Sequence, residues 1–125
     1  MKGFEDSGAD FLYQFKQYLS KENIIICNPH KIYGPQTTDL YLQLRKYKIQ
    51  KILMAGMSTN LNLESHTRHL LEDGYEVAVI ADASASAKLP GMDTFEAALM
   101  NLRMITSKIF TTEEFEQTLR NTNLK

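Results

Sequence analysis

A short polar segment around Lys31 carries the first side chains that could do chemistry. Residues 28–37 place this lysine beside His30 and between two prolines. A lysine at the mouth of a sheet can hold an anion, or deprotonate a nucleophile if burial lowers its pKa. Charged residues in loops are mostly solvated, however, and the spacing alone favours that simpler interpretation.

A second candidate loop, residues 56–62, contains Ser58, Thr59 and Asn60 at the start of a predicted helix. Backbone N–H groups at a helix start can stabilise an oxyanion or a bound carboxylate. The same three side chains are also ordinary helix caps. Residue types and spacing leave both interpretations open.

A stretch of adjacent polar residues, Glu64, Ser65 and His66, suggests a catalytic triad at first sight. Neighbours on a helix project about 100° apart, so these three side chains cannot converge on one substrate atom. His66 and His69 share a helix face, but no third ligand stands at a convincing spacing. We therefore expect no metal, and the sequence suggests no other cofactor.

Two single residues, Cys27 and Asp82, are weaker candidates. Cys27 lies in an apolar run, which is typical of an inert buried thiol, although the end of a strand is also where a nucleophile could sit. Asp82 follows a predicted strand among small residues. We expect its carboxylate to hold a neighbouring loop through hydrogen bonds rather than to act as an acid or base.

The elements that would position these residues alternate along the chain. Apolar residues spaced by three and four predict helices, and short apolar runs predict strands. Asp6 and Ser7 are possible caps of the first helix, Gly74 ends the third, and the pairs Asp93/Glu96 and Thr111/Glu114 have capping-box spacing. The predicted helices cover residues 7–20, 38–48, 59–73, a segment after residue 93 and a short segment after residue 111, and the predicted strands cover residues 23–27, 52–55, 77–80 and 108–111.

This alternation predicts the fold class. Connections too long for hairpins favour a mainly parallel sheet with helices on both faces, a three-layer α/β/α arrangement. A chain of 125 residues suits one domain, which we place over residues 1–125. Ligands of such sheets bind beyond the carboxyl ends of the strands, which selects loops 28–37, 56–62 and 82–91.

The composition excludes several classes of partner. Fourteen Lys and Arg residues against fifteen Asp and Glu residues give a formal net charge of -1, without a basic block, so we expect no nucleic-acid partner. The apolar runs are far shorter than the roughly 20 residues that a membrane span needs. A single cysteine and no signal-peptide pattern favour a cytoplasmic location.

Three segments together resemble the isochorismatase-like cysteine hydrolase family. They are HKIYGPQTTDL at 30–40, AGMSTNLNLESH at 55–66 and DGYEVAVIADA at 73–83, and the likeness runs from about Gly8 to Phe115. The resemblance implies a Rossmann-like α/β fold and a triad of Asp, Lys and Cys. In such a triad the thiolate attacks an amide or related carbon, and water hydrolyses the acyl-enzyme.

Two triad members have no counterpart by this comparison. Lys31 matches the family lysine, but Asn62 stands where the family cysteine lies, and an amide cannot replace a thiolate as nucleophile. The family aspartate ends an apolar first strand that is missing before Ser7, since Asp6 and Asp10 lie at a predicted helix start. We therefore expect a domain truncated at its N-terminus.

The resemblance also assigns the remaining site residues. It implies a strained, sometimes cis, peptide near Met57 and Ser58, and an oxyanion hole made by the N–H groups of Ser58 and Asn62. Lys31, Asn62 and Ser58 are thus the expected catalytic positions, and Tyr33, Met57 and Asn60 the expected substrate contacts.

Three functions follow from these expectations. The first is a catalytically impaired family member that binds a small carboxylate or amide, or that forms a homo-oligomer or pairs with another chain because the missing strand exposes apolar edges. The second is an active cysteine hydrolase of a small amide or a related C–N or C–O bond, completed by another chain or using Cys27. The third is a scaffold without a pocket function.

Overall fold

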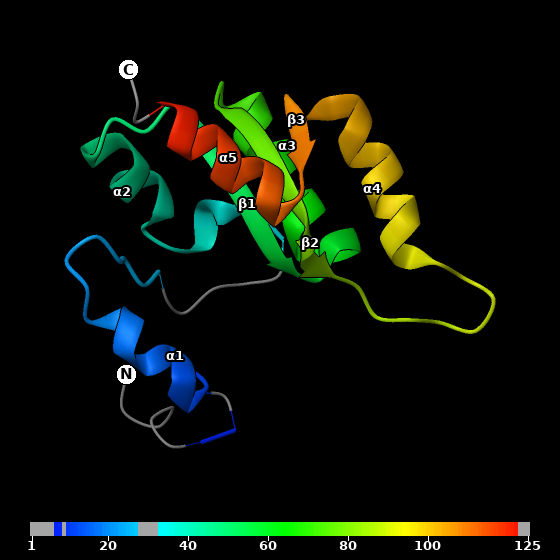
Figure 1. The fold of residues 1–125 in the computed structure, drawn as a ribbon, viewed down its shortest axis with the longest axis horizontal. Coiled ribbons are helices and arrows are strands. Elements are labelled where there is room, and N and C mark those ends of the chain that lie inside the picture. The colour runs from blue at the N-terminus through cyan, green and yellow to red at the C-terminus, as the bar shows by residue number, and fades with distance from the viewer. Residues whose placement is uncertain (1–6, 9, 28–32, 123–125) are drawn as a thin grey trace.

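The computed structural model describes residues 7–8, 10–27 and 33–122 (Figure 1). From residue 38 onward, its helices and strands alternate as the sequence predicts. The strands are β1 (Lys51–Met57), β2 (Glu76–Ala85) and β3 (Lys108–Phe110). The helices are α1 (Tyr13–Leu19), α2 (Leu40–Lys46), α3 (Glu64–Glu72), α4 (Thr94–Ile105) and α5 (Thr112–Thr122), with short helical segments η1 (Pro35–Thr37) and η2 (Thr59–Leu63).

The three strands form one parallel sheet in the order β1-β2-β3. Leu53 pairs with Ala78, and Val79 pairs with Ile109. The β1–β2 register shifts between Met54 and Gly56, so β1 bends as it approaches its carboxyl end. The expected parallel α/β sheet is confirmed.

Helices cover both faces of the sheet, which makes three layers. Figure 1 shows α5 in front of the strands and α3 behind them. The buried core lies on the side of α4 and η2, where four apolar side chains exclude water. These are Leu63, Val79, Leu99 and Leu102.

Local capping fixes where several helices begin and end. The Glu96 N–H donates to the Asp93 carboxylate at 3.0 Å, so the predicted cap of α4 is confirmed. A reciprocal pair, Glu114 N–H to Thr111 Oγ1 at 3.2 Å and Thr111 N–H to Glu114 Oε2 at 2.8 Å, forms the predicted capping box of α5. Gly74 ends α3 with a φ of +88°, a left-handed conformation that favours glycine.

Asp82 joins the sheet to α5. Its Oδ1 atom accepts a hydrogen bond from the Thr112 N–H at 2.8 Å and a second from the Thr112 hydroxyl at 2.9 Å. An orphan N–H at the first turn of a helix thereby gains an acceptor from a different element. The expected structural role of Asp82 in holding a neighbouring segment is confirmed.

We expect Asp82→Ala to lower the free energy of unfolding by about 1 kcal/mol, because the Thr112 N–H loses its acceptor. Urea denaturation followed by circular dichroism measures the change. Asp82→Asn is the matched control, because the amide oxygen can still accept the bond and most of the stability should remain. Equal losses in both variants would contradict the hydrogen-bond explanation.

Two predictions for the N-terminal part of the chain are wrong. Residues 23–27 form no strand, and the side chains of Ile24, Ile25 and Ile26 are 42–43% exposed. The β-branched run favours a strand only where a neighbouring strand pairs with it, and the sheet offers none at this place.

The first helix is shorter than the predicted range 7–20. It covers only Tyr13–Leu19, begins after Leu12 without a side-chain cap, and buries no residue. Asp6 lies outside the described residues, and Ser7 does not cap the helix. Of the helices in the described ranges, none combines the length and apolar character needed to cross a membrane.

Candidate functional site

The carboxyl end of β1 leads into the loop that the resemblance selects. The peptide bond between Met57 and Ser58 is cis, at the place where the resemblance implied such a bond. The Met57 side chain is 74% exposed, and Ser58 precedes η2, a π-helical turn that continues into α3. A π-helical turn was not predicted, because apolar spacing alone does not distinguish it from the first turn of an α-helix.

The Asn62 side chain folds back onto this loop. Its Oδ1 atom accepts a hydrogen bond from the Ser58 N–H, with 3.4 Å between nitrogen and oxygen. The sequence comparison assigned this same N–H to an oxyanion hole. The structure therefore brings Ser58 and Asn62 together. The Ser58 N–H, which the resemblance assigns to an oxyanion hole, donates instead to the Asn62 side-chain oxygen.

The end of β2 supports the loop from the other side. The Thr59 hydroxyl donates to the Ala85 carbonyl at 2.9 Å, and the Asn60 N–H donates to the Ser86 hydroxyl at 3.3 Å. The Asn60 Oδ1 atom is buried and has no hydrogen-bond partner within the described part of the chain. Sequence reasoning did not name Ala85 or Ser86 as site residues, although the run of small residues at 83–87 was the signal for close packing there.

The two histidines of α3 serve different contacts. His66 is 7% exposed, and its Nδ1 atom lies 2.7 Å from the Asn62 carbonyl oxygen. A carbonyl only accepts, so Nδ1 carries the proton. His69 Nδ1 lies 2.8 Å from Gln36 Nε2, on the side of η1. Within the described ranges, no three His, Cys, Asp or Glu side chains are grouped so that they could hold a metal ion, and neither histidine of α3 belongs to such a group.

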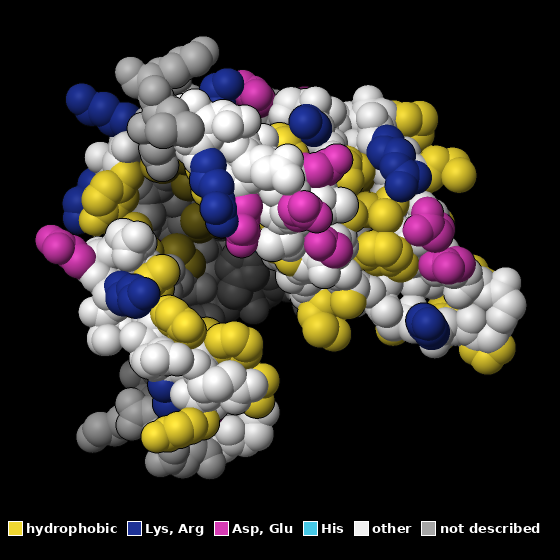
Figure 2. Space-filling view, in the orientation of Figure 1, with side chains coloured by type: hydrophobic (Ala, Val, Ile, Leu, Met, Phe, Trp, Pro, Cys, Tyr) yellow, Lys and Arg dark blue, Asp and Glu magenta, His cyan; other side chains and the backbone are white. Residues whose placement is uncertain are grey.

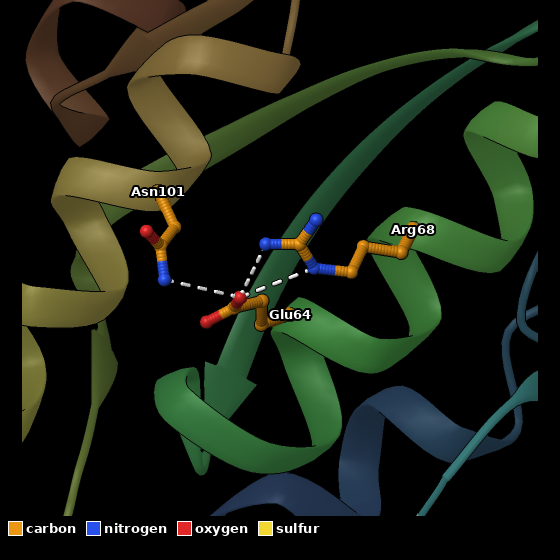
Figure 3. Close-up of polar contacts among 3 residues, drawn as sticks. All are labelled: Glu64, Arg68 and Asn101. Carbon is orange, nitrogen blue, oxygen red and sulfur yellow. Dashed lines mark hydrogen bonds and ion pairs between the residues drawn. The ribbon is translucent and has the colours of Figure 1, made fainter.

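Glu64 lies between Arg68 of its own helix and Asn101 of α4, and so links two helices (Figure 3). Its Oε1 atom accepts hydrogen bonds from Arg68 Nη2 at 2.7 Å and Arg68 Nε at 3.2 Å. Asn101 Nδ2 of α4 donates to the same oxygen at 3.3 Å. Because Glu64 faces α4 while His66 faces the Asn62 carbonyl, residues 64–66 form no triad, as predicted from helix geometry.

Of the two remaining expected positions, Lys31 lies outside the described residues. Tyr33 is 59% exposed, and among the described contacts no hydrogen bond links it to Ser58, Asn60 or Asn62. Its role as a substrate contact stays a prediction.

Cys27 has the character of an unreactive thiol. Partial burial raises the pKa of the Cys27 thiol above its ordinary value, and the nearby Asp39 carboxylate raises it further by charge and by accepting a hydrogen bond. The thiolate is the nucleophilic form, so a raised pKa leaves Cys27 protonated at neutral pH. This environment is the opposite of that around an activated cysteine.

We expect iodoacetamide to modify Cys27 slowly at pH 7, and the rate to keep rising as the pH approaches the raised pKa. Asp39→Asn should speed modification several-fold at pH 7, because removing the negative charge lowers the pKa of Cys27. Mass spectrometry of timed samples gives the rates. Glu116→Gln on α5 is the matched control and should leave the rate unchanged, and an equal acceleration there would refute the local effect of Asp39.

Comparison with known proteins places the chain in a family. Residues 3–114 match the family described as the isochorismatase domain. The uncharacterized isochorismatase family protein YecD of Escherichia coli O157:H7 is 42% identical over 50 residues, which is 40% of this chain and 27% of YecD. The corresponding protein YwoC of Bacillus subtilis (strain 168) is 37% identical over 78 residues, 62% of this chain and 40% of YwoC.

Solved structures share the fold. An isochorismatase-like hydrolase from Alkaliphilus metalliredigens has a TM-score of 0.76 at 25% identity, over 90% of this chain and 59% of that one. The nicotinamidase PncA from Bacillus subtilis has a TM-score of 0.67 at 19% identity, over 78% of this chain and 52% of that one, and shows the fold alone. The chain thus spans less than two thirds of the length of these proteins. With a family match across residues 3–114 and this shared fold, the chain belongs to the isochorismatase family.

Proposed function

We propose that this chain binds a small carboxylate or amide at the carboxyl ends of β1 and β2 without forming an acyl-enzyme. The observation that carries the proposal is the place of Asn62, whose Oδ1 atom lies 3.4 Å from the Ser58 nitrogen. A carboxamide nitrogen is delocalised into its carbonyl, so this side chain cannot attack a substrate carbon. The loop then serves recognition rather than covalent chemistry.

The neighbouring polar groups are also unsuited to a covalent step. The Thr59 hydroxyl is buried and donates to the Ala85 carbonyl. His66 donates from Nδ1 to the Asn62 carbonyl of the preceding helical turn, which fixes the ring against the backbone. The Thr59 hydroxyl is thus engaged in supporting the loop rather than presented to a ligand.

What remains is a set of groups suited to a small polar ligand. The Asn62 amide carries two N–H bonds besides the oxygen that faces Ser58, and these can donate to a carboxylate or to an amide oxygen. The buried Asn60 Oδ1 atom is an acceptor without a partner among the described residues, and an amide N–H of a ligand would satisfy it. The match of Lys31 to the family lysine adds a cation that would favour an anionic ligand.

The competing proposal, an active cysteine hydrolase, has less support. Cys27 would have to be the nucleophile, yet burial and the Asp39 carboxylate raise the pKa of its thiol. Completion of the triad by another chain would still need a thiolate near Ser58, where Asn62 stands.

Titration of the ¹⁵N-labelled protein with nicotinamide and with nicotinate tests the proposal, because one structural neighbour is a nicotinamidase. We expect saturable shifts of backbone amides over residues 58–62 and no release of ammonia from the amide. Asn62→Leu should weaken binding about tenfold, as expected for the loss of one or two hydrogen bonds. Gln117→Leu on exposed α5 is the matched control and should bind normally. Ammonia release that saturates with nicotinamide, or no shift with either compound, would overturn the proposal.

A further inference from the structure

The outer edge of β1 has backbone N–H and C=O groups that face no other strand among the described residues. The Glu76 N–H donates to the Gln50 carbonyl at 3.0 Å, so Gln50 faces β2. Alternate residues of a parallel strand present their backbone groups to opposite sides, which turns Lys51 and Leu53 toward the outer edge. Within the described residues, no strand lies on that side of β1.

This edge has few of the features by which proteins discourage strand addition, which are charged side chains, prolines, bulges and covering elements. Its one charge is Lys51 at the start of the strand, and the register shift lies beyond Met54, so residues 51–54 form a regular edge. The sequence of β1 is apolar after Lys51 and contains no proline. The charge of Lys51 is itself matched, because its Nζ atom lies 2.9 Å from the Glu76 carboxylate. The edge can therefore accept another strand.

The chain also contains a strand-like segment that has no sheet. Ile24, Ile25 and Ile26 carry the β-branched side chains that favour strands, yet each is more than two fifths exposed. Such a run of neighbouring apolar side chains is unfavourable in water. Cys27, at the end of this run, lies close enough to the Asp39 carboxylate before α2 for that charge to raise the pKa of its thiol. The segment therefore lies beside the start of α2, and it forms no strand in the described sheet.

Figure 2 shows apolar side chains exposed around the hollow that separates α1 from the rest of the molecule. From the free edge of β1 and the exposed isoleucine run, we infer that residues 23–27 of a second copy of this chain pair with the outer edge of β1.

A second copy of this chain accounts for both features, the free edge of β1 and the exposed run of isoleucines. Each chain supplies one edge and one segment, so a reciprocal exchange between two chains pairs both edges and covers both isoleucine runs. Such an arrangement closes by two-fold symmetry and leaves no further edge of this kind for a third chain. The pairing supplies main-chain hydrogen bonds as well as apolar burial.

Light scattering with size-exclusion chromatography gives the first test. We expect a mass twice the 14.3 kDa of the chain at concentrations used for NMR. Ile25→Asp should convert the dimer to a monomer, because a carboxylate would be buried in the pairing. Met104→Asp, at a side chain of α4 that is 73% exposed, is the matched control and should stay dimeric. A strictly monomeric native chain would overturn the inference.

A spin label attached to Cys27, the single cysteine of the chain, locates the contact. The label is attached at alkaline pH, where more of this thiol is ionised. Spin-labelled chains are mixed with ¹⁵N-labelled Cys27→Ser chains, and light scattering confirms that the mixture is dimeric. We expect the label to broaden amide signals of residues 51–57 in the ¹⁵N-labelled copies. A label placed by Met104→Cys in a Cys27→Ser background should not affect them. Broadening confined to other segments, such as β3, or no broadening at all, would refute pairing at β1.

Discussion

Leu102→Ala lowers the free energy of unfolding by about 3 kcal/mol, which is a large fraction of the stability of a domain of this size. Leu102 is 0% exposed and packs in the core with Val79 of β2 and Leu99 of the same helix. Truncation to alanine removes the apolar transfer energy of the side chain and leaves a cavity. Urea denaturation at a fixed protein concentration measures the loss.

Met104→Ala is the matched control on α4. The Met104 side chain is 73% exposed, so its truncation should change the free energy of unfolding by less than about 0.5 kcal/mol. Both substitutions lie in the last turn of α4, so the change in helix propensity is similar for the two variants. If both lost equal stability, the core would not lie between α4 and β2.

The order of helices and strands from residue 38 onward could be predicted because local signals and tertiary contacts agree there. The Asp93/Glu96 cap, the Thr111/Glu114 capping box and Gly74 at the end of α3 each set an element boundary through bonds between nearby residues. Such bonds depend on spacing along the chain, which a sequence displays directly. The agreement of local and global preferences also favours reliable folding.

The segment 23–27 shows where this reasoning fails. Three consecutive isoleucines favour a strand, but strand preference measures how side chains fit a pleated surface between neighbours. The described sheet gives these residues no such neighbour. A sequence pattern states what a segment can pair with, and a second strand decides whether it does.

The candidate site was only partly predictable. The loop after β1 followed from the rule that ligands of parallel sheets bind at the carboxyl ends of strands, and the cis bond at Met57–Ser58 was implied by the family resemblance alone. The contact from Ser58 N–H to the Asn62 side chain depends on one side-chain rotamer, which spacing does not specify. The support from Ser86 depends on how the loop after β2 folds back, which is a long-range property.

The contacts that hold the loop in place do not involve the residue that decides its chemistry, Asn62. The loop is held in place by Ala85 and Ser86, whose contacts involve Thr59 and Asn60 rather than Asn62. A change at Asn62 can therefore alter the chemical group presented by the loop while the supporting bonds remain. This independence makes the position suitable for a test in which a thiol is restored.

Asn62→Cys, made in a Cys27→Ser background, should react with iodoacetamide at pH 7 at least about tenfold faster than Cys27 does in the native chain. The thiol would lie at the start of a helix and within reach of the Ser58 N–H, and both stabilise a thiolate and lower its pKa. Cys27 has the opposite environment, in which burial and Asp39 raise the pKa. Timed labelling followed by mass spectrometry gives the two rates.

The same variant should still release no ammonia from nicotinamide. A thiolate alone can form a covalent adduct, but turnover also needs an acid to protonate the leaving amine, and the described side chains hydrogen-bonded to loop 58–62 include no carboxylic acid. Asn62→Ser in the same background is the control for both assays and should neither label nor turn over. Labelling no faster than that of Cys27 would show that the Ser58 N–H does not face position 62 in solution. Turnover by the thiol variant would show instead that Asn62 alone keeps this chain from acting as a hydrolase.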